Sequence, residues 1–382
     1  MRIIQVWPEI LPGRQARVVQ VLGTCTALAR LCEVVEVHVA GLTDDPARML
    51  ERFGFHLPPN LIFRRHRRHL GPISSSRLFL GGLRRALQDA VEGETVVLTR
   101  HYQVAAAAPR FGHPVILEAH EIMADKPGVS ARVRRIEIEA YEHAAGVAFL
   151  SRGLQEAVRR RFGLRSPAVV TPSGAAIADG EPAAVEEAPS GTYAYAGSFR
   201  YPWKGTRTLL EAAAILHRRS PAEERPVLHV YGDFSGAPAE DRRLIEDLSS
   251  GGLLVAHGHR EHGALMRELR RHPVSVLPNS ATSANSRTYS SPLKLTEAMA
   301  LGMGIVATDL PAIREMVDET CALLVPAGDP EHLARGIDRL LRDPDLRRRL
   351  GTAALARARR FSFDARARRL VDLAGSLLSR HA

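Results

Sequence analysis

The sequence predicts an α/β protein with two Rossmann-like, doubly wound domains that face each other across a cleft. Strand and helix patterns alternate along almost the whole chain, which is typical of parallel sheets covered by helices. At 382 residues the chain is long for a single hydrophobic core. A polar, proline-bearing stretch without periodicity, residues 175–191, indicates a linker. We therefore expect domains at 1–174 and 192–362.

The first predicted domain opens with an apolar strand pattern, a proline-rich loop and a helix. Its later segments repeat this order, with short β-branched runs between stretches of helical periodicity. We expect strands at residues 3–7, 33–40, 60–64, 96–99, 115–118, 147–150 and 168–171. We expect helices at residues 18–31, 77–91, 102–110 and 130–145, and another after residue 151.

The same alternation restarts after the linker. We expect strands at residues 193–197, 227–231, 253–257, 274–278, 305–308 and 322–325. Helical patterns fall at residues 205–217, 240–249, 293–301, 331–342 and 346–360, and an amphipathic helix closes the chain from residue 363. Repeated units of this kind favour a second parallel sheet.

The composition is that of a globular protein, with 45% apolar and 25% charged residues. No run of about 18 apolar residues is present, so we expect no membrane span. The opening MRIIQVW lacks a signal-peptide core. Three cysteines far apart in the chain do not suggest a disulfide framework. We therefore expect a cytoplasmic protein.

The net charge of +10 is concentrated in the segment 64–85, which holds seven arginines and no acidic residue. Leucines and a phenylalanine are interleaved with these arginines, so a peripheral contact with an anionic membrane, such as the inner face of the cell membrane, is one interpretation. The other interpretation is an ordinary loop and helix face exposed to solvent. We see no nucleic-acid-binding motif, and the 5% aromatic content offers little stacking surface, so we expect no nucleic-acid partner.

The stretch 288–309, TYSSPLKLTEAMALGMGIVATD, combines a helix start with a buried strand. Ser291 before Pro292 is typical of an N-cap followed by proline at the first helical position. The free N–H groups of such a helix tip bind anions, and Lys294 adds a positive charge there. Glu297 follows on the same face, and the ~7 Å between the tip and this residue suits a diphosphate and its ribose. The alternative is an ordinary amphipathic helix before a core strand.

Two further segments should line the cleft, because they follow strands of the predicted sheets. The sequence AHEI places His120 and Glu121 at a strand end, and GSFRYPWKG offers Arg200 and Lys204. These two cations could neutralise a diphosphate without a metal ion. Of the 52 basic residues only three are lysines, at positions 126, 204 and 294, which favours a point-charge role, although chance is a competing explanation.

Four motifs give the second domain a resemblance to the retaining GT-B glycosyltransferases, family 4 (glycosyltransferase group 1). They are YAGSFRYPWKG (195–205), HVYGD (229–233), VSVLPN (274–279) and SPLKLTEAMALGMGIVATDLPAIREMV (291–317). The first domain matches more loosely, through LEAHE and VAFLSRGLQEAVRRRFG. The resemblance implies a GT-B fold and metal-independent transfer of a sugar from a nucleotide-diphosphate sugar, with retention and no separate cofactor. Glycan, lipid-linked and small-molecule acceptors, including a polysaccharide precursor, stay open.

The resemblance also implies roles for individual residues. Glu297 would bind the nucleotide ribose, Arg200 and Lys204 the diphosphate, and His120 would sit beside the donor sugar, with Glu121 as a second catalytic candidate. The helix tip would contribute further donor contacts from Ser291, Leu293, Lys294 and Leu295. In relatives the closing helix, here residues 363–382, crosses back to the first domain.

Two positions depart from the family pattern. The usual E-x7-E spacing requires a glutamate at 289, where this chain has Tyr289. The phenol could hydrogen-bond a sugar hydroxyl in its place. The loop after the first strand often carries two adjacent glycines near the phosphates, and here only Gly13 remains. Tyr289 keeps a catalytically impaired GT-B partner subunit open as an alternative, beside a sugar-nucleotide epimerase or a phosphorylase.

Three other patterns suggest metal sites but have simpler interpretations. Asp343-Pro344-Asp345 spells a D-x-D signature, yet its place between two arginine-rich helices favours a turn with helix capping. His257, His259 and His262 lie at a strand end and a helix start, and we expect no zinc there; His259 or Arg260 could border a nucleobase. His66 and His69, in the basic segment, are expected to face solvent.

Overall fold

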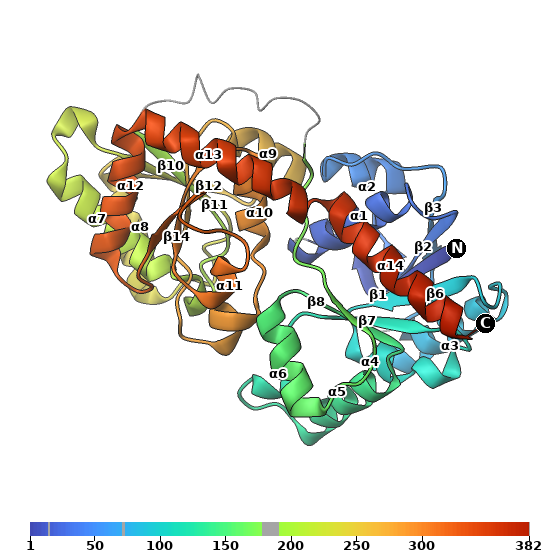
Figure 1. Cartoon of the computed structure of the whole chain (residues 1–382). Coiled ribbons are helices and arrows are strands. Elements are labelled where there is room, and N and C mark those ends of the chain that lie inside the picture. Colours follow the sequence, from blue (N-terminus) through green and yellow to red (C-terminus); the bar gives the residue numbers. More distant parts are fainter. Residues whose placement is uncertain (14–15, 71–72, 178–190, 382) are drawn as a thin grey trace. The chain divides into compact units, whose positions relative to one another are not determined.

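The computed structural model of the chain describes residues 1–13, 16–70, 73–177 and 191–381. It separates into two compact units (Figure 1). The first unit contains Met1–Gly174 together with Phe363–Ala382, and the second contains Ala175–Ser362. Most of the predicted linker, residues 178–190, lies outside the described residues.

The first unit is built on a parallel sheet of seven strands in the order β3-β2-β1-β6-β7-β8-β9. These strands are β1 (Arg2–Leu11), β2 (Val34–Leu42), β3 (Leu61–Arg65), β6 (Thr95–Thr99), β7 (Val115–Ala119), β8 (Gly146–Phe149) and β9 (Ala168–Val170). A separate two-stranded ladder joins β4 (His69–Leu70) to β5 (Ile73–Ser74). The strand order reverses between β1 and β6, so a crevice is expected outside the carboxyl ends of these two strands.

Helices cover both faces of this sheet (Figure 1). They are α1 (Ala16–Leu28), α2 (Pro46–Arg52), α3 (Ser76–Gln88), α4 (Tyr102–Ala106), α5 (Ala131–His143), α6 (Arg152–Phe162) and the C-terminal helix α14 (Phe363–His381). Helix α14 lies against α1, and the Phe363 ring fills the space over Gly23, where a Cβ atom would come within 2.4 Å of the ring. A side chain at position 23 would therefore push the C-terminal helix away.

The second unit repeats this design with six parallel strands in the order β12-β11-β10-β13-β14-β15. These strands are β10 (Thr192–Ala196), β11 (Val227–Tyr231), β12 (Leu254–Gly258), β13 (Val274–Leu277), β14 (Gly304–Thr308) and β15 (Leu323–Val325). Here the order reverses between β10 and β13. Gly205, at φ 68°, approaches the end of β13 so closely that a Cβ atom would lie 1.7 Å from the carbonyl oxygen of Pro278, so only glycine fits.

Two hydrophobic cores hold helices to the two faces of this sheet. One core joins the sheet to α7 (Thr206–Arg219), α8 (Ala239–Ser250) and α12 (Pro330–Arg342). The other joins it to α9 (His262–Leu269), α10 (Leu293–Ala300) and α11 (Pro311–Arg314). Helix α13 (Pro344–Ala358) contributes leucines to the first core and alanines to the second.

The predicted pair of doubly wound parallel sheets is confirmed, and most elements lie within a few residues of their expected bounds. Helix α10 begins at Leu293 with Pro292 as its N-cap, so the predicted N-cap role of Ser291 is wrong. The Ser291 hydroxyl is instead buried against the sulfur of Met316, at 3.5 Å. Sequence patterns also missed α2 and a π-helical segment at Asn285–Tyr289. The cleft expected between the two units stays a prediction.

Candidate functional site

The loop after β10 places Lys204 at the point where the strand order of the second unit reverses. The residues Pro202–Lys204 form one 3-10 turn, and Gly205 leads from it into α7. The carbonyl oxygen of Trp203 accepts hydrogen bonds from the Ser280 backbone N–H (2.9 Å) and the Ser286 hydroxyl (3.2 Å). The loop is therefore tied to the segment that follows β13, which fixes the start of the Lys204 side chain.

Lys294 reaches the same region from the first turn of α10. Its ammonium lies 3.4 Å from the hydroxyl of Tyr195 and 4.5 Å from the centroid of that ring. Tyr195 is a fully buried residue of β10, so the lysine lies over the strand that leads to Lys204. The neighbouring Leu295 points the other way, into the core under α10, and contributes no side chain to this region.

Lys204 and Lys294 form a pair of partly buried positive charges. Burial lowers the pKa of the Lys204 ammonium below its ordinary value. The pKa of Lys294 is lowered further, first by burial and then by the positive charge of Lys204, while Glu297 acts in the opposite direction. Within the described parts of the chain neither lysine forms an ion pair, so their charge is available to an anion.

Arg200 lies at the rim of this pair. Its guanidinium carbon is 6.0 Å from the centroid of the Tyr201 ring, and the Lys204 ammonium is 5.5 Å from the same centroid. The backbone N–H of Arg200 donates to the hydroxyl of Ser198, at 3.1 Å. The side chain is exposed and packs along Gly236. It therefore borders Lys204 through a shared aromatic ring and remains accessible to solvent.

Glu297 is buried one turn beyond Lys294, with 5% of its surface exposed. The Nε2 atom of His262, the first residue of α9, lies 2.9 Å from its Oε1 atom. Because a carboxylate can only accept, the imidazole donates in this hydrogen bond. The other carboxylate oxygen keeps its capacity to accept hydrogen bonds, which is what binding to a pair of ribose hydroxyls requires.

In the first unit, His120 follows β7 and belongs to a buried hydrogen-bonded network with Glu118 and Arg366. Its Nε2 atom is hydrogen-bonded to the Oε1 atom of Glu118, and the Arg366 guanidinium binds the Oε2 atom of the same carboxylate. Burial, together with the positive charge of Arg100, lowers the pKa of His120 to about 4. The imidazole is therefore neutral near pH 7, with Nε2 as the donor to Glu118 and Nδ1 as an acceptor.

Part of the chain matches a known protein family. Residues 190–343 match the family described as Glycosyl transferases group 1. The second unit belongs to the group 1 glycosyltransferases. The chain is 34% identical to the D-inositol 3-phosphate glycosyltransferase of Frankia alni over 44% of its length and 30% identical to that of Salinispora tropica over 47%. These alignments cover only 41% and 37% of the relatives' own lengths, which is less than half.

Solved structures show that the whole chain has the GT-B glycosyltransferase fold. The sucrose-phosphate synthase of Thermosynechococcus elongatus superimposes with a TM-score of 0.74, with 99% of both chains covered and 20% identity. The Anabaena protein HepE in complex with UDP-glucose gives a TM-score of 0.69, with 98% and 100% of the chains covered and 18% identity. At these identities the likeness concerns the fold alone.

The predicted residues of the glycosyltransferase unit divide into three groups. Lys204, Lys294 and Glu297 lie close together, with Arg200 at their rim, whereas the side chains of Ser291 and Leu295 are buried beneath them. The half-buried residues Leu293 and Tyr289 flank the start of α10. The roles of all these residues in donor binding stay predictions, because no ligand is present. His262 was missed as a partner of Glu297, since the two are 35 residues apart.

Glu121 and Gly13 are the other residues of the first unit that the sequence predicted for the site. The Glu121 carboxylate forms an ion pair with Lys126, at 2.6 Å. Lys126, the third lysine of the chain, therefore neutralises an acid of the first unit and does not belong to the pair formed by Lys204 and Lys294. The Glu121 carbonyl oxygen accepts a hydrogen bond from the Tyr102 hydroxyl. Gly13 is half-buried at the end of the described segment 1–13. Catalytic or binding roles for Glu121 and Gly13 stay predictions.

The metal-like patterns take part in ordinary contacts. Asp343 caps α13 by accepting from the Leu346 backbone N–H at 2.9 Å, which confirms the capping interpretation. His257 lies 2.9 Å from His229 and stacks on Tyr231. His66, expected in solvent, is instead half-buried and hydrogen-bonded to the buried His38, at 2.8 Å. In the part of the chain that the structure describes, no three His, Cys, Asp or Glu residues are grouped so as to hold a metal ion.

Proposed function

We propose that this protein transfers a sugar from a nucleotide-diphosphate sugar to an acceptor, with retention of the anomeric configuration and without a metal ion. The observation that carries the proposal is the pair formed by Lys204 and Lys294 in a group 1 glycosyltransferase unit. Two desolvated ammonium groups that repel each other are an unfavourable arrangement in the empty protein. A diphosphate bound between them would reverse that cost.

The same pair has a catalytic consequence. As the bond between the sugar and the diphosphate breaks, negative charge grows on the leaving diphosphate. Fixed positive charges stabilise that charge more strongly in the transition state than in the ground state, which accelerates transfer. The N–H groups at the start of α10 and the guanidinium of Arg200 would add to this stabilisation. The leaving phosphate would help to deprotonate the acceptor in a front-face attack.

Glu297 fits the role of ribose ligand. It is held by His262 and lies one helical turn beyond Lys294, about the spacing between a diphosphate and its ribose. Tyr289 would contact the donor sugar through its phenol. The neutral His120 would accept a hydrogen bond from a sugar hydroxyl at Nδ1, because Nε2 is engaged with Glu118.

Known proteins support the donor class and leave the acceptor open. HepE of Anabaena was solved in complex with UDP and with UDP-glucose. Glycan, lipid-linked and small-molecule acceptors all remain compatible, and the matched relatives are named for D-inositol 3-phosphate. No helix in the described residues is long and apolar enough to cross a membrane. In the basic segment 64–85, Phe79 and Leu83 are buried, so a membrane contact there would rest on the exposed arginines and on the exposed Leu78.

A thermal-shift screen of UDP-, GDP-, ADP- and TDP-sugars tests the donor class, because a ligand that binds only the folded state raises the melting temperature. The screen is repeated with EDTA. Lys204→Ala and Glu297→Ala should each reduce the shift strongly, whereas Arg348→Ala, at an exposed position on α13, should not. NMR of the transferred anomeric centre then tests retention. A bound donor with no transfer or hydrolysis would favour the non-catalytic partner suggested by Tyr289.

A further inference from the structure

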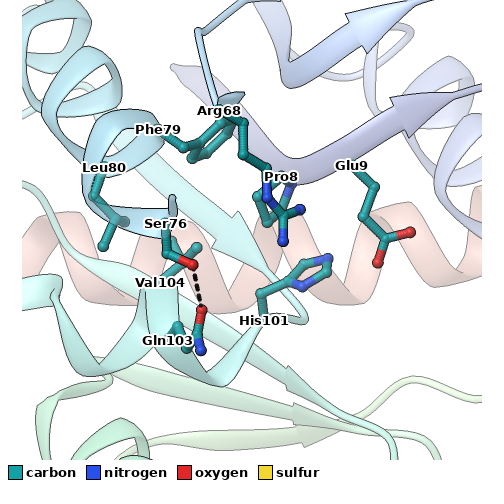
Figure 2. A pocket seen from close by; sticks show the side chains of 9 residues that line it. All are labelled: Pro8, Glu9, Arg68, Ser76, Phe79, Leu80, His101, Gln103 and Val104. Carbon is teal, nitrogen blue, oxygen red and sulfur yellow. Dashed lines mark hydrogen bonds between the residues drawn. The ribbon is translucent and has the colours of Figure 1, made fainter. Parts of the chain in front are cut away.

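The first unit contains a second polar site, at the point where its strand order reverses. We call it the β1–β6 hollow. Its walls come from Pro8 and Glu9 in β1, from Arg68 and the start of α3, and from three residues that follow β6: His101, Gln103 and Val104 (Figure 2). It contains about 370 Å³ of empty space, including open solvent at its mouth. None of the donor-site or catalytic residues predicted from the sequence lines this hollow.

Two nitrogen atoms in the walls are buried and have no hydrogen-bond partner among the residues that the structure describes. They are the Nε2 atom of His101 and the Nε atom of Arg68. Figure 2 shows the His101 ring and the Arg68 guanidinium pointing toward one another across the same space. Buried polar atoms in folded proteins almost always have a partner, so two unpartnered nitrogen atoms at the wall of one hollow fit a site that is filled by water or by a ligand with acceptor atoms.

The surroundings of the hollow are positively charged. The pKa of His101 is lowered to about 3, first by burial and then by the charges of Arg100, Arg17 and Arg68, so this imidazole is neutral near pH 7. Glu9 is the acidic residue of the wall, and its carboxylate is already bound by Arg17, at 2.8 Å. The arginine charges therefore exceed the acidic charge, which favours an anionic ligand.

The start of α3 adds to this preference. Ser76 is the first residue of this 13-residue helix and lies in the wall, so the positive end of the helix dipole faces the hollow. The Ser76 hydroxyl donates to the Oε1 atom of Gln103, at 3.0 Å. This bond orients the Gln103 amide and leaves its NH₂ group able to donate to a ligand.

We propose that the β1–β6 hollow binds the phosphate monoester of a hydroxylated acceptor, through Arg68, His101 and the first turn of α3. Arg68 supplies the charged donor and His101 a neutral one at Nε2. Glu9 can accept hydrogen bonds from acceptor hydroxyls with the oxygen that Arg17 leaves free. The role of this ligand as acceptor rests on the proposed glycosyltransferase function, whereas the anion site itself does not.

Calorimetry on the full chain at constant ionic strength tests the site. The probes are glucose 6-phosphate, inorganic phosphate, glucose and glucuronate. We expect both phosphates to bind and glucose to bind at least tenfold more weakly than glucose 6-phosphate. Arg68→Gln and His101→Gln should each weaken glucose 6-phosphate at least tenfold, whereas Arg135→Gln, at an exposed position on α5, should change nothing. Melting curves without ligand show whether each variant folds.

A donor-site variant separates this inference from the proposed function. In Lys294→Met, glucose 6-phosphate should bind as in the parent, while stabilisation by nucleotide sugars should be lost. If the phosphates bind but no nucleotide sugar does, the transferase proposal fails and the anion site stands. Three results overturn the site: no binding of either phosphate, loss of phosphate binding in Lys294→Met alone, or unchanged binding in a folded Arg68→Gln. Glucuronate binding as tight as glucose 6-phosphate overturns the phosphate assignment.

Discussion

His262 and Glu297 face each other in the second unit, with Nε2 of the imidazole 2.9 Å from Oε1 of the carboxylate. One residue opens α9 and the other lies within α10, so two helices that follow different strands fix the same carboxylate. Glu297 is buried, and without this donor its oxygen would lack a partner. The pair therefore holds the proposed ribose ligand in one orientation before a nucleotide arrives.

We predict that His262→Ala weakens nucleotide binding about ten- to a hundredfold, because the loss of a hydrogen bond to a charged group costs about 1.5–3 kcal/mol. The effect should be confined to ligands that carry a ribose. Calorimetry with the nucleoside diphosphate from the screen and with pyrophosphate measures both affinities. His262→Gln, which can still donate, should restore part of the loss. Equal weakening of pyrophosphate would contradict a role for Glu297 at the ribose.

We predict that Lys294→Met stabilises the empty protein while it abolishes stabilisation by the donor. Burial and Lys204 depress the pKa of Lys294, so the protonated side chain costs more free energy in the folded state than in the unfolded state, where water solvates it. Between the depressed pKa of the folded state and about 10.5, the unfolded chain binds more protons than the folded chain. The destabilisation that the lysine causes therefore becomes smaller as the pH rises. Removing the charge should therefore raise the melting temperature near pH 7 by about 2–4 °C, the shift that about 1 kcal/mol produces.

The pH dependence provides the internal check for this variant. The gain of Lys294→Met over the parent should shrink as the pH is raised toward 10, since the parent lysine then loses its proton in the folded state. Melting curves at pH 7, 8.5 and 10 measure the difference. Lys126→Met is the matched control, because Lys126 is paired with Glu121 and gains nothing from removal. A constant difference across this range would argue against a depressed Lys294 pKa.

The sequence predicted those parts of the site that depend on local pattern. Lys204 and Lys294 were found because each lies just after a strand or at a helix start, and because lysine is rare in this chain. Contacts between distant segments were not predictable in the same way. The partner of Glu118 is Arg366, 248 positions away on the C-terminal helix. Arg68 and His101 line the same hollow only because the strand order reverses between β1 and β6.

We predict that Arg366→Met destabilises the first unit by about 3–5 kcal/mol, because it leaves the buried Glu118 carboxylate without its cation. Arg366 also donates to the hydroxyl of Thr24 and to the carbonyl oxygen of Pro172, so its loss would loosen α14 from the sheet. Urea unfolding followed by circular dichroism measures the change. Arg368→Met, at an exposed position on the same helix, should stay within about 0.5 kcal/mol of the parent.

The same variant should change the response to acid. Burial alone would raise the pKa of Glu118, but Arg366 and His120 together outweigh burial and hold this pKa well below its usual range. The folded parent therefore keeps the carboxylate ionised at pH values where the unfolded chain takes up a proton. That stabilisation is fully present above about pH 4.5 and is lost as the pH falls. Arg366→Met lacks most of it, so its stability should fall less between pH 6 and pH 3. A parallel loss in both proteins would contradict this account.

We predict that transferase activity shows no histidine titration near pH 6.5 that depends on His120. Burial and the positive charge of Arg100 lower the His120 pKa to about 4, so the imidazole stays neutral from about pH 5.5 to 8 and its hydrogen-bonding state does not change. The kcat/KM of the parent should therefore be flat over this range as far as His120 is concerned. Arg100→Gln removes one cause of the low His120 pKa, so the acidic limb of the pH profile should move toward neutral pH in this variant. His120→Asn should lower kcat/KM at least tenfold at every pH. The parent profile could instead show an inflection near pH 6.5 that vanishes in His120→Asn. That result would show that the imidazole titrates normally, and it would contradict the neutral hydrogen-bonding role assigned to His120.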